Sequence, residues 1–69
     1  MNNINEYNRM LQKDPEDFRA FFGRGVAYYE MGEYDKALED IKEVLDIYPD
    51  FNEAYYYLSS IYEKINSNN

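Results

Sequence analysis

The chain has 69 residues, with 14 acidic and seven basic side chains and a formal net charge of −7. It contains no cysteine and no histidine, which excludes disulfides and thiolate or imidazole metal sites. Its charge disfavours binding to nucleic acid or to an anionic membrane, and no apolar run approaches the roughly 18 residues that span a bilayer. We therefore expect one small cytoplasmic domain without a cofactor.

The first predicted helix covers about residues 3–13, where apolar residues recur at helical spacing. Pro15 ends it, because proline lacks the amide hydrogen that a continuing helix donates. The same proline is expected to open a second helix at about residues 16–31, with acidic residues such as Asp17 at its positive end. Gly32 is expected to end this helix, since glycine enters the left-handed conformation at low cost.

The third predicted helix covers about residues 34–47 and ends before Pro49. The fourth covers about residues 51–65. Asn66 follows it, 34 positions after Gly32, and is expected to take the same left-handed conformation. No stretch alternates with period two for long enough to predict a strand. The expected fold class is all-α, with four antiparallel helices joined by short turns.

A 34-residue period relates the two halves of the chain. Identical residues stand 34 positions apart at Pro15 and Pro49, Ala20 and Ala54, Tyr28 and Tyr62, and Leu11 and Leu45. A fixed period of this size indicates stacked units that each bury only part of their own apolar surface. The sequence therefore predicts an α-solenoid fragment. Its single domain, residues 1–69, is expected to contain a half unit (1–17), a full unit (18–51) and a second half unit (52–69).

Residues 18–51 resemble the tetratricopeptide repeat (TPR) family. The aromatic, small and closing positions of the family pattern fall on Phe21, Gly25, Tyr28, Gly32, Tyr34, Ala37 and Pro49. Arg24 departs from the pattern where Leu is usual, and Val44 departs where Ala is usual. The resemblance implies a helix–turn–helix stack in which Gly25 and Ala37 let two helices approach closely. It also implies a protein-interaction module.

Residues suited to catalysis are scarce. An enzyme needs a nucleophile, an acid or base with a shifted pKa, or a metal. The chain has no His, Cys or Thr, and its three serines have no base partner at a suggestive spacing. Glu39, Asp40 and Glu43 lie along the third predicted helix, where we expect a solvated face. We predict neither an enzyme nor a metal site.

In TPR proteins the first helix of each unit lines a concave groove that holds a peptide. By resemblance, the groove residues are Arg19, Phe22, Val26 and Tyr29 from one helix and Glu53, Tyr56, Ser60 and Glu63 from the next. The Lys and Asn with which chaperone-binding members clamp a terminal carboxylate are absent from these positions. A groove of aromatic rings and carboxylates suits an apolar peptide or protein segment that carries Lys or Arg.

The alternative for the groove is that its aromatic side chains simply pack on one another. If Phe22, Tyr29 and Tyr56 instead form a ligand surface separate from the core, alanine at these positions should leave the helix content nearly unchanged. Alanine at the packing positions Phe21, Tyr28 and Tyr55 should then unfold a chain this small.

Self-association into a homo-oligomer is the second functional hypothesis. The first and last helices each lack a repeat partner, and we expect them to expose Tyr7 and Met10, and Tyr55, Leu58 and Tyr62, respectively. Apolar patches of this kind are rarely left in water. The last helix of one copy and the first of another could rebuild a unit, in a head-to-tail contact that yields rings or filaments. An isologous dimer through the last helix competes with this arrangement, and so do further repeats of a longer array.

Overall fold

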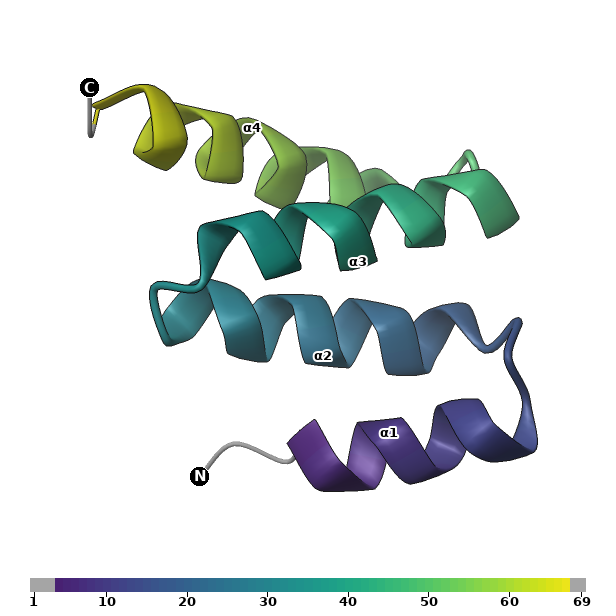
Figure 1. Ribbon diagram of the computed structural model, residues 1–69. Helices are drawn as coiled ribbons and strands as arrows, with labels where there is room; N and C mark the ends of the chain where they lie inside the picture. The colour runs from purple at the N-terminus through teal and green to yellow at the C-terminus, as the bar shows by residue number, and fades with distance from the viewer. Residues whose placement is uncertain (1–3, 68–69) are drawn as a thin grey trace.

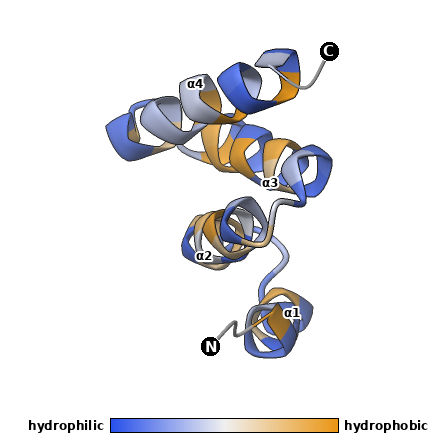
Figure 2. Ribbon diagram, turned by 90° about the vertical axis from the view of Figure 1, so that its left-hand side faces the viewer, coloured by the Kyte–Doolittle hydropathy of each residue, from blue (hydrophilic) through white to orange (hydrophobic). Residues whose placement is uncertain are grey.

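The computed structural model describes residues 4–67, which fold into four helices joined by short turns. The helices are α1 (Ile4–Lys13), α2 (Phe18–Glu30), α3 (Tyr34–Ile47) and α4 (Asn52–Ser67). They stack in chain order as antiparallel neighbours, with α1 at one end and α4 at the other (Figure 1). Figure 2 looks along the helix axes and shows α2 and most of α4 offset to one side of α1 and α3. The predicted all-α stack of four helices is confirmed.

The N-terminus of α2 differs from the prediction. The helix begins at Phe18, and Pro15 lies in the preceding turn. The Asp17 carboxylate caps the helix by accepting hydrogen bonds from the backbone N–H groups of Arg19, at 3.1 Å, and Ala20, at 3.4 Å. Aspartate is among the preferred N-cap residues because its short side chain satisfies amides that lack an intrahelical partner. The prediction that Pro15 opens α2 is therefore wrong.

Gly32 ends α2 as predicted, with a φ of +82°. Its N–H donates to the carbonyl of Tyr29 at 3.1 Å, and the N–H of Glu33 donates to the carbonyl of Tyr28 at 2.9 Å. These two bonds form a Schellman motif, which satisfies the last carbonyls of the helix. The matching prediction for Asn66 is wrong, because α4 continues through that residue. A helical conformation costs asparagine less than the left-handed one where no turn demands it.

The core lies between α2, α3 and α4. Its buried apolar residues are Ala20, Ala27, Ala37, Ile41, Val44, Ala54 and Ile61. α1 contributes no buried residue. The predicted close approach of α2 and α3 is confirmed at Gly25, where an added Cβ would lie 3.0 Å from Cδ1 of Ile41 and 3.1 Å from Cβ of Asp40. Larger side chains at this junction would push the two helices apart.

Replacing Ala37 by Leu should destabilise the chain by about 1–3 kcal/mol, because Ala37 is fully buried and the added atoms have no space. That loss is a large part of the stability of a small domain. Thermal unfolding followed by circular dichroism measures it. Glu39→Leu, on the exposed side of the same helix, is the matched control. An Ala37→Leu chain that melts together with the control would contradict the close contact.

α1 packs on α2 through a second glycine. The ring of Tyr7 lies so close to Gly23 that an added Cβ would overlap it. The residues 34 positions later are Ile41 on α3 and Tyr57 on α4. The larger residue of the pair therefore lies on the first helix of the α1–α2 junction but on the second helix of the α3–α4 junction. Tyr57 packs against the buried cluster that contains Ile41. The α1–α2 junction and its equivalent one period later, between α3 and α4, are thus filled by opposite choices of side-chain size.

Candidate functional site

A continuous row of aromatic rings runs along the side of α2 that faces α4. In order of contact, this aromatic row consists of Tyr48, Phe18, Phe51, Phe22, Tyr57, Tyr29 and Tyr34, with Tyr56 joined to Tyr57. Successive ring centroids are 5.0–5.7 Å apart and meet edge to face. Such pairs contribute about 0.5–1.5 kcal/mol each beyond the burial of area. The row therefore fixes α2 and α4 to each other along most of the length of α2.

Three of the predicted groove residues, Phe22, Tyr29 and Tyr56, belong to this row. Phe22 and Tyr29 are half-buried and pack against the core cluster. Tyr57, which the sequence analysis did not select, lies between them, with centroid distances of 5.5 Å to Phe22 and 5.7 Å to Tyr29. The prediction that Phe22 and Tyr29 lie apart from the core is wrong, because both rings pack against the core cluster.

Tyr56 is a side branch of the aromatic row, joined to it at Tyr57. It is 70% exposed, and its ring contacts only Tyr57 among the described ring pairs. The guanidinium of Arg19 lies 5.8 Å from the centroid of the Phe18 ring. Of the remaining groove residues, Glu53 and Glu63 are exposed, and Val26 and Ser60 are half-buried. Residues 53, 56, 60 and 63 recur at helical spacing and therefore share one side of α4.

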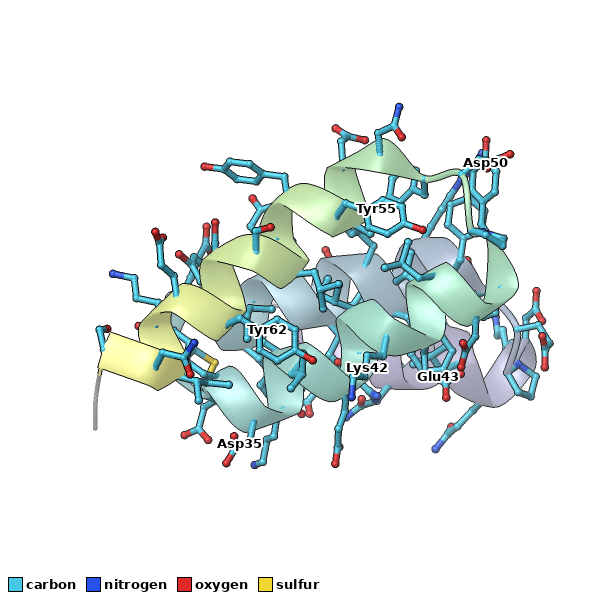
Figure 3. All side chains as sticks on the ribbon, turned by 90° about the horizontal axis from the view of Figure 1, so that it is seen from above. Asp35, Lys42, Glu43, Asp50, Tyr55 and Tyr62 are labelled. Atoms are coloured by element: carbon cyan, nitrogen blue, oxygen red, sulfur yellow. The ribbon has the colours of Figure 1, made fainter. Side chains whose placement is uncertain are left out.

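The three residues predicted for self-association on α4 lie at the open end of the stack. Tyr55 and Tyr62 are 47% and 42% exposed and lie on the same side of α4 (Figure 3). The Tyr55 hydroxyl donates a hydrogen bond to the carbonyl of Pro49 at 2.9 Å. Leu58 is half-buried and packs against the core cluster. Among residues 4–67, this end of the stack thus presents exposed aromatic surface.

The other end of the stack differs from the prediction. Tyr7 does not lie free on the outer side of α1, because its ring rests on Gly23 of α2. Met10 lines a shallow hollow together with the charged residues Glu6, Arg9 and Lys13. The outer side of α1 is therefore charged around Met10, as expected for a helix that faces water.

A largely buried ion pair joins three helices. The Arg24 guanidinium donates to both carboxylate oxygens of Asp40 at 2.8 Å and to Oδ1 of Asn8 at 2.7 Å. The hydrogen bond to Asp40 raises the pKa of Arg24, against the opposing effect of burial. Asp40 is only 4% exposed, so the prediction that it belongs to a solvated face with Glu39 and Glu43 is wrong. Arg24 was the sequence feature that could have predicted this ion pair, because a cation at a usually apolar position needs a buried acceptor.

Within residues 4–67, no group of three or more acidic side chains is arranged to hold a metal ion. A hollow of about 540 Å³ beside the ion pair is lined by Phe21, Arg24, Glu39, Asp40, Lys42, Glu43 and Asp46. Across the same residues, no helix is both long enough and apolar enough to cross a bilayer.

The chain folds into four antiparallel helices, its sequence pattern repeats every 34 residues, and small residues stand at the close junction of α2 and α3. These features define an α-helical repeat protein. The family profile described as tetratricopeptide repeat matches residues 18–51. The chain belongs to the tetratricopeptide repeat family, whose units are protein-interaction modules and not catalytic centres.

Three curated relatives illustrate the similarity. The tetratricopeptide repeat and J domain-containing co-chaperone DNJ1 of Cryptococcus neoformans is 33% identical over 84% of this chain. Tetratricopeptide repeat protein 14 of Mus musculus is 36% identical over 80% of it, and the Hsp70-Hsp90 organizing protein of Triticum aestivum is 27% identical over 75%. The chain spans 11%, 7% and 9% of the lengths of these relatives, respectively.

Proposed function

We propose that the chain is a non-enzymatic binding module that holds an apolar peptide or protein segment carrying Lys or Arg. The binding surface is the side of the stack formed by α2 and α4. The observation that carries this proposal is the aromatic row, from which the exposed Tyr56 branches at Tyr57, on the side of α4 that also carries the exposed Glu53 and Glu63. Aromatic faces accept apolar and cationic groups, and carboxylates pair with basic ones.

The edge-to-face contacts of the row support this function because they fix the surface before a ligand arrives. Tyr57 holds Phe22 and Tyr29 in place, so ligand binding does not have to order these rings. Tyr56 is free to contact the ligand. A Lys or Arg of the ligand can stack on it and pair with Glu53 or Glu63.

The proposed ligand differs from a chaperone tail. The DNJ1 relative is named a co-chaperone and the wheat relative an Hsp70-Hsp90 organizing protein. In this chain the positions of the carboxylate-clamping Lys and Asn hold Phe22, Val26, Tyr56 and Ser60. None of these side chains carries the positive charge that a terminal carboxylate requires.

A labelled peptide of alternating Leu and Lys tests the proposal, with the same peptide carrying Glu for Lys as its control. Fluorescence anisotropy should show binding of the basic peptide only. Tyr56→Ala should weaken it roughly tenfold through loss of a stacked ring, while Tyr55→Ala, on another face of α4, should have no effect. Equal binding of the two peptides, or an unchanged affinity in Tyr56→Ala, would argue against this surface.

The alternative function is self-association through α4, and the exposure of Tyr55 and Tyr62 is the observation that favours it. Sedimentation of the pure chain over a wide concentration range measures this directly. An assembly that dissociates when both tyrosines are replaced by Lys would support the alternative. A monomer at every concentration would exclude it and leave the peptide-binding function.

A further inference from the structure

The aromatic row changes in composition along its length. We call Phe18, Phe51 and Phe22 the phenylalanine half, and Tyr57, Tyr29, Tyr34 and Tyr56 the tyrosine half. The two halves meet where the ring centroids of Phe22 and Tyr57 lie 5.5 Å apart. Tyr48 lies beyond the phenylalanine half, at the C-cap of α3. The row therefore presents hydrocarbon rings in one part and phenol rings in the other.

The hydroxyl groups of the tyrosine half make no hydrogen bond within residues 4–67. The Tyr55 hydroxyl, by contrast, donates to a backbone carbonyl at 2.9 Å. Ser60 adds a further hydroxyl, on the side of α4 that carries Tyr56. Serine in a helix often donates to a carbonyl of the preceding turn, as Ser67 does at 3.2 Å, but Ser60 does not. The described part of the fold therefore uses none of the hydroxyl groups along this part of the row.

These hydroxyl groups nevertheless reach the surface. Tyr57, Tyr29, Tyr34 and Ser60 are half-buried. Among the described residues no fully buried side-chain oxygen lacks a hydrogen-bond partner, so the hydroxyl oxygens of these four are not fully buried. Edge-to-face contacts fix the three half-buried rings, and their hydroxyls are therefore held in place before a ligand arrives.

An extended peptide chain matches such a surface. A hydroxyl group both donates and accepts hydrogen bonds, so it suits the N–H and the C=O groups of a main chain. An extended segment presents these groups along its whole length, whereas a helix pairs them internally. Several hydroxyls beside bare rings therefore favour a ligand whose main chain is unpaired and whose apolar side chains pack on the rings.

The two halves of the row lie toward different ends of α2 and α4, which run in the same direction (Figure 1). Phe18 begins α2 and Phe51 immediately precedes α4, so the phenylalanine half lies toward the N-terminal ends of these helices. Tyr29 lies in the last turn of α2. Glu63 is exposed on the side of α4 that carries Tyr56, two turns further along the helix. A cation that pairs with Glu63 therefore lies toward the tyrosine end of the row.

We propose that the bound segment lies extended along the aromatic row and that the hydroxyl groups of the tyrosine half hydrogen-bond its main chain. Its apolar side chains pack on the phenylalanine half, and its Lys or Arg lies over Tyr56 toward Glu63. This inference rests on the peptide-binding function proposed above and adds the conformation of the ligand. A helical segment binds more weakly, because its main-chain groups are already paired.

Removal of two hydroxyls without removal of their rings tests the proposal. The hydroxyl-free variant is Tyr29→Phe with Tyr57→Phe, and its control is Tyr28→Phe with Tyr62→Phe, which removes one hydroxyl from each of the same helices outside the row. None of these four hydroxyls makes a hydrogen bond within residues 4–67, so thermal unfolding should be unchanged in both variants. In fluorescence anisotropy the hydroxyl-free variant should bind the Leu–Lys peptide about tenfold more weakly, and the control should bind it as the parent does.

A second peptide shows whether the lost hydrogen bonds go to the main chain. In this ester peptide each Leu of the Leu–Lys peptide is replaced by its α-hydroxy acid, which puts an oxygen in place of the N–H and keeps every side chain. The ester peptide should bind the parent chain about tenfold more weakly than the amide peptide. The hydroxyl-free variant should bind the two peptides with nearly equal affinity, because the partners of the altered groups are gone.

The outcomes separate this proposal from the function on which it rests. Binding of the Leu–Lys peptide that requires Tyr56 but is equally tight in the parent and the hydroxyl-free variant would overturn the extended main-chain contact and leave the peptide-binding function in place. An equal loss in the control variant, or the same ester penalty in the parent and the hydroxyl-free variant, would also overturn it. Absence of binding to the folded parent, or binding that Tyr56→Ala leaves unchanged, would overturn the peptide-binding function and this inference together.

Discussion

The Arg24→Leu variant should unfold at a much lower denaturant concentration than the parent chain. It leaves the carboxylate of Asp40, which is 4% exposed, without the guanidinium that donates two hydrogen bonds to it. Removing one partner of a buried ion pair costs about 3–5 kcal/mol, which is comparable to the whole stability of a small domain. Urea unfolding followed by circular dichroism measures the loss.

The double variant Arg24→Leu with Asp40→Leu separates the charge from the packing. An apolar pair of similar volume can replace a buried ion pair at little cost, so the double variant should recover most of the stability that the single variant loses. Asn8 loses a hydrogen-bond partner in both variants and does not distinguish them. A double variant as unstable as Arg24→Leu would show that the unpaired carboxylate is not the cause.

Alanine at Phe22 should destabilise the chain by about 3 kcal/mol, the lower end of the range for Phe→Ala because the ring is only half-buried. The substitution removes the ring that contacts both Phe51 and Tyr57. It therefore breaks the aromatic row in its middle and loosens α4 from α2. Thermal and urea unfolding report the change.

Tyr56→Ala is the matched comparison for Phe22→Ala. Tyr56 is 70% exposed and only branches from the row at Tyr57, so its loss should change the free energy of unfolding by less than about 0.5 kcal/mol. Equal destabilisation by the two substitutions would mean that Tyr56 is part of the core. If neither destabilises the chain, the row does not hold the helices together.

The helix positions were predictable because their boundaries depend on local signals. Gly32 ends α2 through a Schellman motif, and Pro49 follows α3, whose observed bounds are Tyr34–Ile47. The 34-residue period predicted the order of the stack, because residues one period apart occupy equivalent places. The start of α2 was predicted two residues too early because Asp17 competes with Pro15 for the N-terminus, and only the hydrogen bonds decide between them.

The candidate site was less predictable because it depends on pairs that are distant in sequence. Asp40 looks like its exposed neighbours on α3 until Arg24, 16 positions earlier, is placed beside it. Tyr57 was overlooked because its equivalent one period earlier is Gly23, which has no side chain to place on a surface. Its contacts in the aromatic row are with Phe22 and Tyr29 of the preceding repeat, and a single repeat does not reveal such contacts.

A longer array could arise by gene duplication, and the side-chain sizes at two equivalent junctions affect that route. These junctions pair Tyr7 with Gly23 and, one period later, Ile41 with Tyr57. An in-frame gene duplication of residues 18–51 would bring a second Gly23 opposite Ile41, where Tyr57 now lies. Ile and Gly together leave a void, which costs about 24 cal/mol per Å³. A newly duplicated repeat would therefore be unstable at its seam, and lengthening this protein by one unit requires a compensating substitution at position 23 of the copy.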